Sequence, residues 1–295
     1  MAAMAAKKKA TAKKAASSKS PLRAALAELG LEDEAAFLER FSSFEIELRP
    51  AKVKNARTRI GGLPLVPKGF VWPDHRWPMR EVNKWPASMK KEVEAAKKKK
   101  QVQVIGDELA TPISFLAQID LAEVPRTTET EVLPDHGLLL FFASTQTGVD
   151  DPLFSHRVAS TVRWVEDDGK LAPMKQPRTV DEDGPTDEVA FRLEKRLACL
   201  LPPADRKALG KRVDRTVMNR FQKATVRVTD VLLPHPEYEA AGMMPPEGEV
   251  ALLRIGENDD AGFIVGDASW LTFSIREADL RARRFEAARA SVFIG

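Results

Sequence analysis

The sequence has little of several residue types, and each shortage excludes a class of protein. It contains one cysteine, Cys199, among 295 residues, so no disulfide can form within the chain. Its longest apolar run, Leu138 to Ala143, is far shorter than the ~20 residues of a membrane-spanning helix. The N-terminus also lacks the apolar core of a secretory signal peptide. We therefore expect a cytoplasmic protein without a membrane partner.

Motifs for the common enzyme chemistries are also missing. The sequence has no glycine-rich phosphate loop, no Gly-x-Ser-x-Gly, no His-Glu-x-x-His and no cysteine pair. Its histidines, at positions 75, 136, 156 and 235, lack the spacing of zinc ligands. We predict no cofactor, no metal site and no catalytic residue.

Acidic residues are absent from the first 20 positions. Six of the chain's 46 basic residues lie there, which leaves 40 basic against 43 acidic residues in the rest. Such a charged segment without large hydrophobes predicts a disordered arm over residues 1–20. It could make weak, non-specific contacts with nucleic acid, solubilise the chain, or act as a targeting peptide if the source has organelles. The lysines concerned are Lys7, Lys8, Lys9, Lys13, Lys14 and Lys19.

Strand patterns dominate what is present. The two most apolar segments, Ile113–Ile119 and Gly137–Ala143, predict strands that are buried on both faces. Phe44 to Leu48 alternates apolar and charged residues, which predicts a strand with one wet face. Residues 157–166 form another strand candidate. The pattern favours a β-rich α+β fold with a mostly antiparallel sheet.

Helical patterns occur at two places. The N-terminal one starts at Pro21 and continues in a second short helix around Phe37–Phe41. The other is inserted at about residues 186–223. There we predict one helix from Thr186 and a second helix over residues 204–223. Ala190, Leu193, Leu197 and Leu201 form the buried stripe of the first, and Cys199 packs beside it.

Four motifs occur in an order that resembles one known family. They are Arg59–Pro73, with its Gly-Gly-x-Pro and Trp-Pro, then Phe115–Leu121, Leu133–Phe142 and Leu252–Leu280. Together they resemble the YwqG-like family, a bacterial domain family of unknown function. The resemblance implies a single α+β domain over residues 21–295 with an internal duplication, and no known chemistry. The chain departs from the family pattern at Val265-Gly266-Asp267 and in residues 240–248, and residues 74–111 resemble an insertion.

Two passages of the sequence can be superposed. Leu116-x-Gln118-Ile119 matches Leu252-x-Arg254-Ile255, and Asp135-x-x-x-Leu139-x-Phe141 matches Asp267-x-x-x-Leu271-x-Phe273. We interpret this match as a duplicated strand-loop-strand unit whose copies pack around a pseudo-twofold axis. A small ligand could bind where charged residues meet at the hairpin ends, unless these residues form structural ion pairs. The candidates are Asp120, Asp135, Arg254, Asp267 and Arg276.

Two further features could bind a partner. Trp72, Trp77 and Trp85 each precede a proline, so their rings could form a peptide groove or a strap over the sheet. A basic helix face carries Lys207, Lys211 and Arg215, which could dock an acidic partner or simply face solvent.

These features lead to three functional hypotheses. The favoured one is a protein- or peptide-binding module without catalysis, whose partner is unknown. The alternative is a nucleic-acid-associated accessory factor that uses the basic arm. The third is an enzyme with an unrecognised polar or cation site, for which the acidic turn at residues 257–262 offers oxygen ligands.

Overall fold

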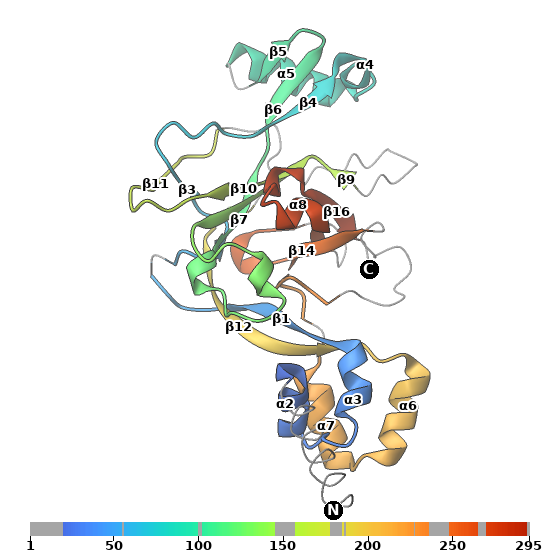
Figure 1. Cartoon of the computed structure of the whole chain (residues 1–295). Helices are drawn as coiled ribbons and strands as arrows, with labels where there is room; N and C mark the ends of the chain where they lie inside the picture. Colours follow the sequence, from blue (N-terminus) through green and yellow to red (C-terminus); the bar gives the residue numbers. More distant parts are fainter. Residues whose placement is uncertain are drawn as a thin grey trace, which may run out of the picture.

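A large sheet forms the centre of the molecule, with a small lobe at one end and a group of helices at the other (Figure 1). The computed structural model describes residues 20–54, 56–99, 102–144, 157–177, 185, 187–226, 228–235, 248–264 and 270–293. The basic arm and Asp267 therefore lie outside the described residues, apart from Ser20.

The central sheet has eleven strands within the described residues, in the order β10–β8–β7–β2–β12–β1–β13–β14–β15–β16–β9. All neighbouring strands are antiparallel, which confirms the predicted fold class. The strands are β1 (Ser42–Pro50), β2 (Arg59–Ile60), β7 (Phe115–Asp120), β8 (Leu138–Ala143), β9 (Arg157–Val158), β10 (Ser160–Val165), β12 (Val189–Cys199), β13 (Val231–Leu232), β14 (Glu249–Gly256), β15 (Trp270–Arg276) and β16 (Arg289–Phe293).

The sheet nearly closes on itself. Its two terminal strands, β9 and β10, are separated in sequence by Ala159 alone. The backbone N–H of Ala290 in β16 donates to the Oγ of Ser160 in β10 over 2.7 Å, which links opposite ends of the strand order. Closure of this kind removes free edges that would otherwise pair with other chains.

The two predicted hairpins have the same register. Ile119 pairs with Leu139 in β7–β8, and Ile255 pairs with Leu271 in β14–β15. Each hairpin also has one irregularity, which falls between Phe115 and Ala117 in the first copy and between Ala251 and Leu253 in the second. The superposed positions 116 and 252 are therefore equivalent in the fold.

The equivalence extends to the hydrogen bonds between each hairpin and the residues that precede its neighbouring strand, β2 in the first copy and β13 in the second. The side chain of Gln118 donates to the carbonyl of Arg57, and that of Arg254 donates to the carbonyl of Thr229. The backbone N–H of Asp120 donates to the Thr58 hydroxyl.

In the second copy, the N–H of Gly256 donates to the carboxylate of Asp230. Equivalent positions thus carry different side chains that make equivalent hydrogen bonds. The predicted duplication is a duplication of hydrogen bonding as well as of strand order.

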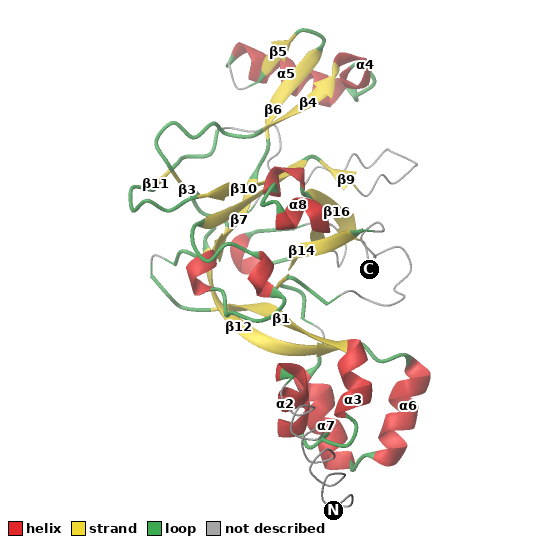
Figure 2. Ribbon diagram, in the orientation of Figure 1, coloured by secondary structure: helices red, strands yellow, loops and turns green. Residues whose placement is uncertain are grey.

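Helices pack around the end of the sheet where β1 begins and β12 ends (Figure 2). They are α2 (Pro21–Glu28), α3 (Ala35–Leu38), η1 (Glu39–Phe41), α6 (Pro203–Arg212) and α7 (Arg215–Ala224). Their core contains Leu26, Leu209 and Phe221, together with Cys199 from β12. Burial raises the pKa of the Cys199 thiol, so this residue packs as a small apolar side chain, as predicted.

The predicted helix from Thr186 is wrong, because β12 occupies residues 189–199. This segment pairs with β1 over nine residues, from Ser42–Cys199 to Pro50–Phe191, and that ladder overrides its helical spacing. The N-terminal helices and the two buried strands are confirmed. The single strand predicted at 157–166 is two strands, because β9 pairs with β16 and β10 pairs with β8.

Two other expectations need correction. The single helix over 204–223 is two helices, because Val213 is extended and Asp214 starts α7 by accepting a hydrogen bond from the N–H of Thr216. Glu45, expected on a wet face, is buried and forms an ion pair with Arg196 at 3.4 Å.

Residues 74–111 form the lobe, which has a hydrophobic cluster of its own. It contains β4 (Asp74–Pro78), α4 (Met79–Val82), α5 (Ala87–Lys98), β5 (Gln103–Ile105) and β6 (Glu108–Pro112). The remaining elements are β3 (Leu65–Val66), η2 (Leu121–Glu123), η3 (Thr130–Val132), β11 (Ala172–Pro173), η4 (Asp259–Ala261), α8 (Glu277–Arg281) and η5 (Phe285–Ala287).

Candidate peptide-binding groove

The charged residues predicted at the hairpin ends lie in different surroundings. Asp120 is buried, where its carboxylate contacts the Nε of Arg57 at 2.5 Å and also accepts from the N–H of Ala122. Arg254 is buried as well and donates to two backbone carbonyls, those of Thr229 and Val228. Both side chains therefore stabilise the ends of the duplicated strands.

The other predicted ligand residues lie at the surface or outside the described chain. Asp135 is exposed and contacts the Nδ1 of His136 at 2.6 Å. This hydrogen bond lowers the pKa of Asp135 and raises that of His136. Arg276 is exposed at the open end of its hairpin, opposite Glu249. A ligand role for these residues stays a prediction.

The tryptophans point into the protein. Trp72 is buried, donates to the carbonyl of Ile113 over 2.8 Å and contacts Phe142 edge to face. Trp77 and Trp85 contact each other, with ring centroids 5.2 Å apart, and pack against the hydrophobic cluster of the lobe. In this arrangement the indoles cover apolar surface.

The basic helix residues are exposed, but they do not form one row. Lys207 and Lys211 lie on α6, whereas Arg215 is the first residue of α7. The break at Val213 and Asp214 divides the predicted face between two helices. Partner binding at this surface stays a prediction.

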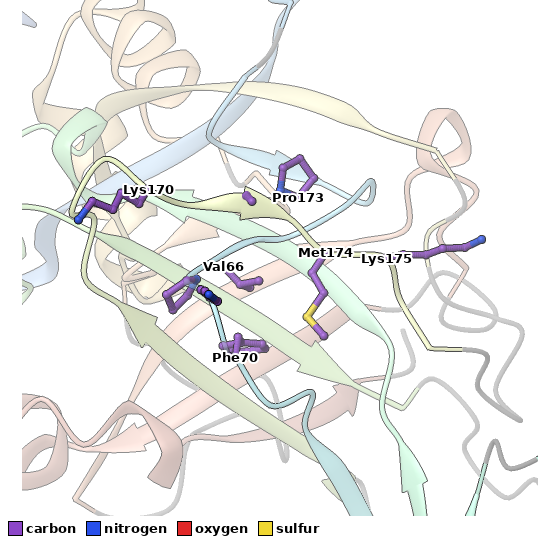
Figure 3. A pocket seen from close by; sticks show the side chains of 10 residues that line it. Val66, Phe70, Lys170, Pro173, Met174 and Lys175 are labelled. Carbon is purple, nitrogen blue, oxygen red and sulfur yellow. The ribbon is translucent and has the colours of Figure 1, made fainter.

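A groove with a volume of about 440 Å³ lies beside the two-stranded sheet formed by β3 and β11 (Figure 3). Two short pairs join the strands, Val66 with Ala172 and Leu65 with Pro173. The lining residues are Val66, Pro67, Lys68, Gly69, Phe70, Lys170, Ala172, Pro173, Met174 and Lys175. The groove is therefore built from two segments that are about a hundred residues apart in the sequence.

A tight turn forms one wall of the groove. The N–H of Phe70 donates to the carbonyl of Pro67 over 3.1 Å, and Gly69 has a φ of 85°. A positive φ at the third position of such a turn favours glycine. The turn sets Phe70 over the ring of Phe142, with centroids 6.3 Å apart, so the groove wall is joined to the core of the sheet.

Hydrogen bonds hold the opposite wall against the body. Asp167 and Asp168 accept from the N–H groups of Gly169 and Lys170, which shapes the turn before β11. After β11, the N–H of Met174 donates to the carbonyl of Pro64 over 2.9 Å. Both walls are thus fixed by backbone contacts before any ligand is bound.

The groove has a lysine at each end and apolar side chains between them, and Lys68 of the turn also lines it. Lys170 and Lys175 lie at opposite ends, and Val66, Phe70 and Met174 lie between them (Figure 3). All three lining lysines are exposed, and no acidic residue lines the groove within the described chain. Lys170 has one distant partner, Asp168, at 3.9 Å. This arrangement favours a ligand that combines apolar groups with negative charge.

Sequence reasoning missed this groove. It identified residues 59–73 as a family motif but assigned no role to residues 170–175. The available signal was the cluster Lys170-Leu171-Ala172-Pro173-Met174-Lys175, a short apolar stretch between two lysines. The sequence alone did not indicate that this stretch pairs with Leu65–Val66.

Comparison with known proteins identifies a family whose function is unknown. Residues 58–292 match a protein family described as a domain of unknown function, DUF1963. No curated protein matches the chain. Within the described residues, no group of three or more His, Cys, Asp or Glu side chains could hold a metal ion. In the same part of the chain, none of the helices has both the length and the apolar character needed to cross a membrane.

Proposed function

We propose that this chain, which belongs to the DUF1963 domain family, is a protein- or peptide-binding module whose groove takes an extended acidic segment. The observation that carries the proposal is the pairing of an apolar centre with lysines at both ends of the groove. An extended peptide can place apolar side chains into such a centre while its acidic residues meet the lysines.

The spacing of the lysines defines the ligand further. Lys170 and Lys175 are five residues apart, so an extended wall would separate them by at most ~17 Å. An extended peptide has the same rise per residue. The ligand should therefore carry two acidic residues about five positions apart, with apolar residues between them.

The chemistry of the lining favours binding over the two alternatives. None of the described residues that line the groove has a carboxylate, imidazole, thiol or hydroxyl group, so lysines are the only ionisable side chains among them. A nucleic acid would present a continuous series of phosphates, whereas this groove interrupts its positive charge with Val66, Phe70 and Met174. Both features support a peptide ligand.

The proposal also covers the origin and location of the protein, its basic arm and a second contact surface. The resemblance of Arg59–Pro73 to the YwqG-like family supports a bacterial origin, and the single cysteine supports a cytoplasmic location. Weak nucleic-acid contact by the basic arm would show as steeply salt-dependent retention that vanishes when residues 1–20 are deleted. A second contact surface at Lys207, Lys211 and Arg215 would lose an acidic partner on charge reversal.

Charge reversal in the groove tests the main proposal. The probe is a fluorescein-labelled peptide with two glutamates five positions apart and valine or leucine between them. The double variant K170E/K175E should weaken its binding about tenfold or more, because each exposed ion pair contributes ~0.2–1 kcal/mol and reversal adds repulsion.

The control is K52E/K54E, which makes the same charge change at two exposed lysines outside the groove. It should bind the probe as the unaltered chain does. Equal weakening in the two double variants would mean that net charge and not the groove attracts the peptide, and the proposal would fail.

A further inference from the structure

We infer that the free edge of β5 in the lobe binds an extended acidic segment of another protein by strand addition. This site is separate from the groove. The lobe sheet has the order β4–β6–β5, so within the described residues β5 pairs with β6 alone. The other edge of such a strand presents unpaired backbone N–H and C=O groups, which are a template for an incoming strand.

The two edges of the lobe sheet differ in how they are protected. On β4, Arg76 and Pro78 provide the charge and the missing N–H that commonly block strand pairing. On β5, Gln103, Val104 and Ile105 are all exposed, and the strand contains neither a charged residue nor a proline. Pairing is therefore open on β5 and hindered on β4.

The exposed side chains of β5 define one face of the partner. Val104 lies opposite Leu109, and Leu109 lies opposite Trp77, so these three residues share one face of the sheet. Leu109 is fully buried, whereas Val104 is 49% exposed. The row of apolar side chains therefore reaches the edge of the sheet with its last member partly uncovered. A partner residue beside Val104 would continue this row and should be apolar.

The charge of the lobe defines the rest of the partner. Residues 74–111 contain nine lysines and arginines against six acidic residues. Lys97 and Lys98 end α5 and Lys99 follows as its C-cap, four residues before β5 begins. Lys97 forms an ion pair with Glu94 at 2.7 Å, so Lys98 and Lys99 carry the exposed positive charge here. An acidic segment matches this field, whereas a second copy of the chain would bring two positive lobes together. The partner strand should thus alternate apolar and acidic residues.

The probe for this inference is a short fluorescein-labelled peptide that alternates valine and glutamate. The unaltered chain should bind it saturably, and amide hydrogen exchange in residues 103–105 should slow on binding. The same peptide with alternate backbone nitrogens methylated cannot complete the ladder. It should bind about tenfold more weakly or worse.

A matched pair of variants locates the site. Val104→Ser removes the apolar contact, while Val53→Ser changes a valine of nearly equal exposure, 48%, outside the lobe. Val104→Ser should weaken binding several-fold and Val53→Ser should not. The inference is overturned if the methylated peptide binds as tightly, if the two variants bind alike, or if binding does not saturate below ~1 mM.

The groove variant K170E/K175E separates this inference from the proposed function. In this variant, which removes acidic-peptide binding in the groove, the alternating peptide should still slow amide hydrogen exchange in residues 103–105, because the β5 edge is intact. Loss of binding in K170E/K175E with full binding in Val104→Ser would place the probe in the groove and contradict strand addition.

Discussion

Phe141 and Phe273 pack edge to face, with ring centroids 5.0 Å apart and ring planes at 70°. They occupy equivalent positions in the two copies of the duplicated unit, opposite Ala117 and Leu253. Contact between equivalent residues places both beside the pseudo-twofold axis. Outward from the β12–β1 pair, each side has a two-residue strand (β2 or β13), then a hairpin (β7–β8 or β14–β15), then one more strand (β10 or β16); β9 is added beyond β16. The axis therefore also passes between β12 and β1.

A double-mutant cycle tests whether the two copies share one core at this contact. Phe141→Leu and Phe273→Leu should each destabilise the protein, because both rings are fully buried. The double variant should lose less free energy of unfolding than the two single losses combined, by ~0.5–1.5 kcal/mol. Urea unfolding of the four proteins measures this coupling. Strict additivity would mean that the rings do not stabilise each other.

Two glycines in the same motif should respond differently to alanine. Gly61 has a φ of 70°, and a Cβ there would lie 2.0 Å from the carbonyl oxygen of Asp187. Gly69 has a φ of 85° but open space around its Cα. Gly69→Ala should cost ~1–2 kcal/mol from backbone strain alone, and Gly61→Ala clearly more. Equal losses in thermal or urea unfolding would show that the contact with Asp187 is not rigid.

Asp230 should make stability depend on pH. Burial raises its pKa from 3.8 to about 6, although it accepts a hydrogen bond from Gly256 and lies near Arg254. Between these two values the folded chain binds more protons at this site than the unfolded chain. The free energy of unfolding should therefore fall as pH rises through this window, and the loss persists above it.

Asp230→Asn tests this assignment. Asparagine keeps an oxygen for the Gly256 N–H and does not titrate, much as Thr58 does at the equivalent position in the first copy. The melting temperature of the variant relative to the unaltered chain should rise between pH 4 and pH 6.5. Curves that stay parallel across this range would show that Asp230 keeps an ordinary pKa.

The sequence predicted the parts of the fold that local pattern determines. Strands β7 and β8 were found because nearly every residue in them is apolar, which is typical of strands covered on both faces. The duplication was found because apolar residues recur in the same order, and the strand register confirms it.

Long-range pairing explains what was missed. Ala190, Leu193 and Leu197 have helical spacing, and only the ladder with β1 makes their segment a strand. The groove depends on the pairing of Leu65–Val66 with Ala172–Pro173. No local sequence pattern in either segment predicts this pairing. Contacts between distant segments determined both features, so neither could be derived from spacing alone.

The dependence of peptide affinity on acid spacing tests the proposed function most directly. Fluorescence anisotropy would compare peptides of equal charge and composition whose two glutamates are two, five or eight positions apart. Because Lys170 and Lys175 lie at opposite ends of the groove, affinity should be highest at a spacing of about five. This maximum should disappear in K170E/K175E. Equal affinity at all three spacings would contradict the groove as the binding site.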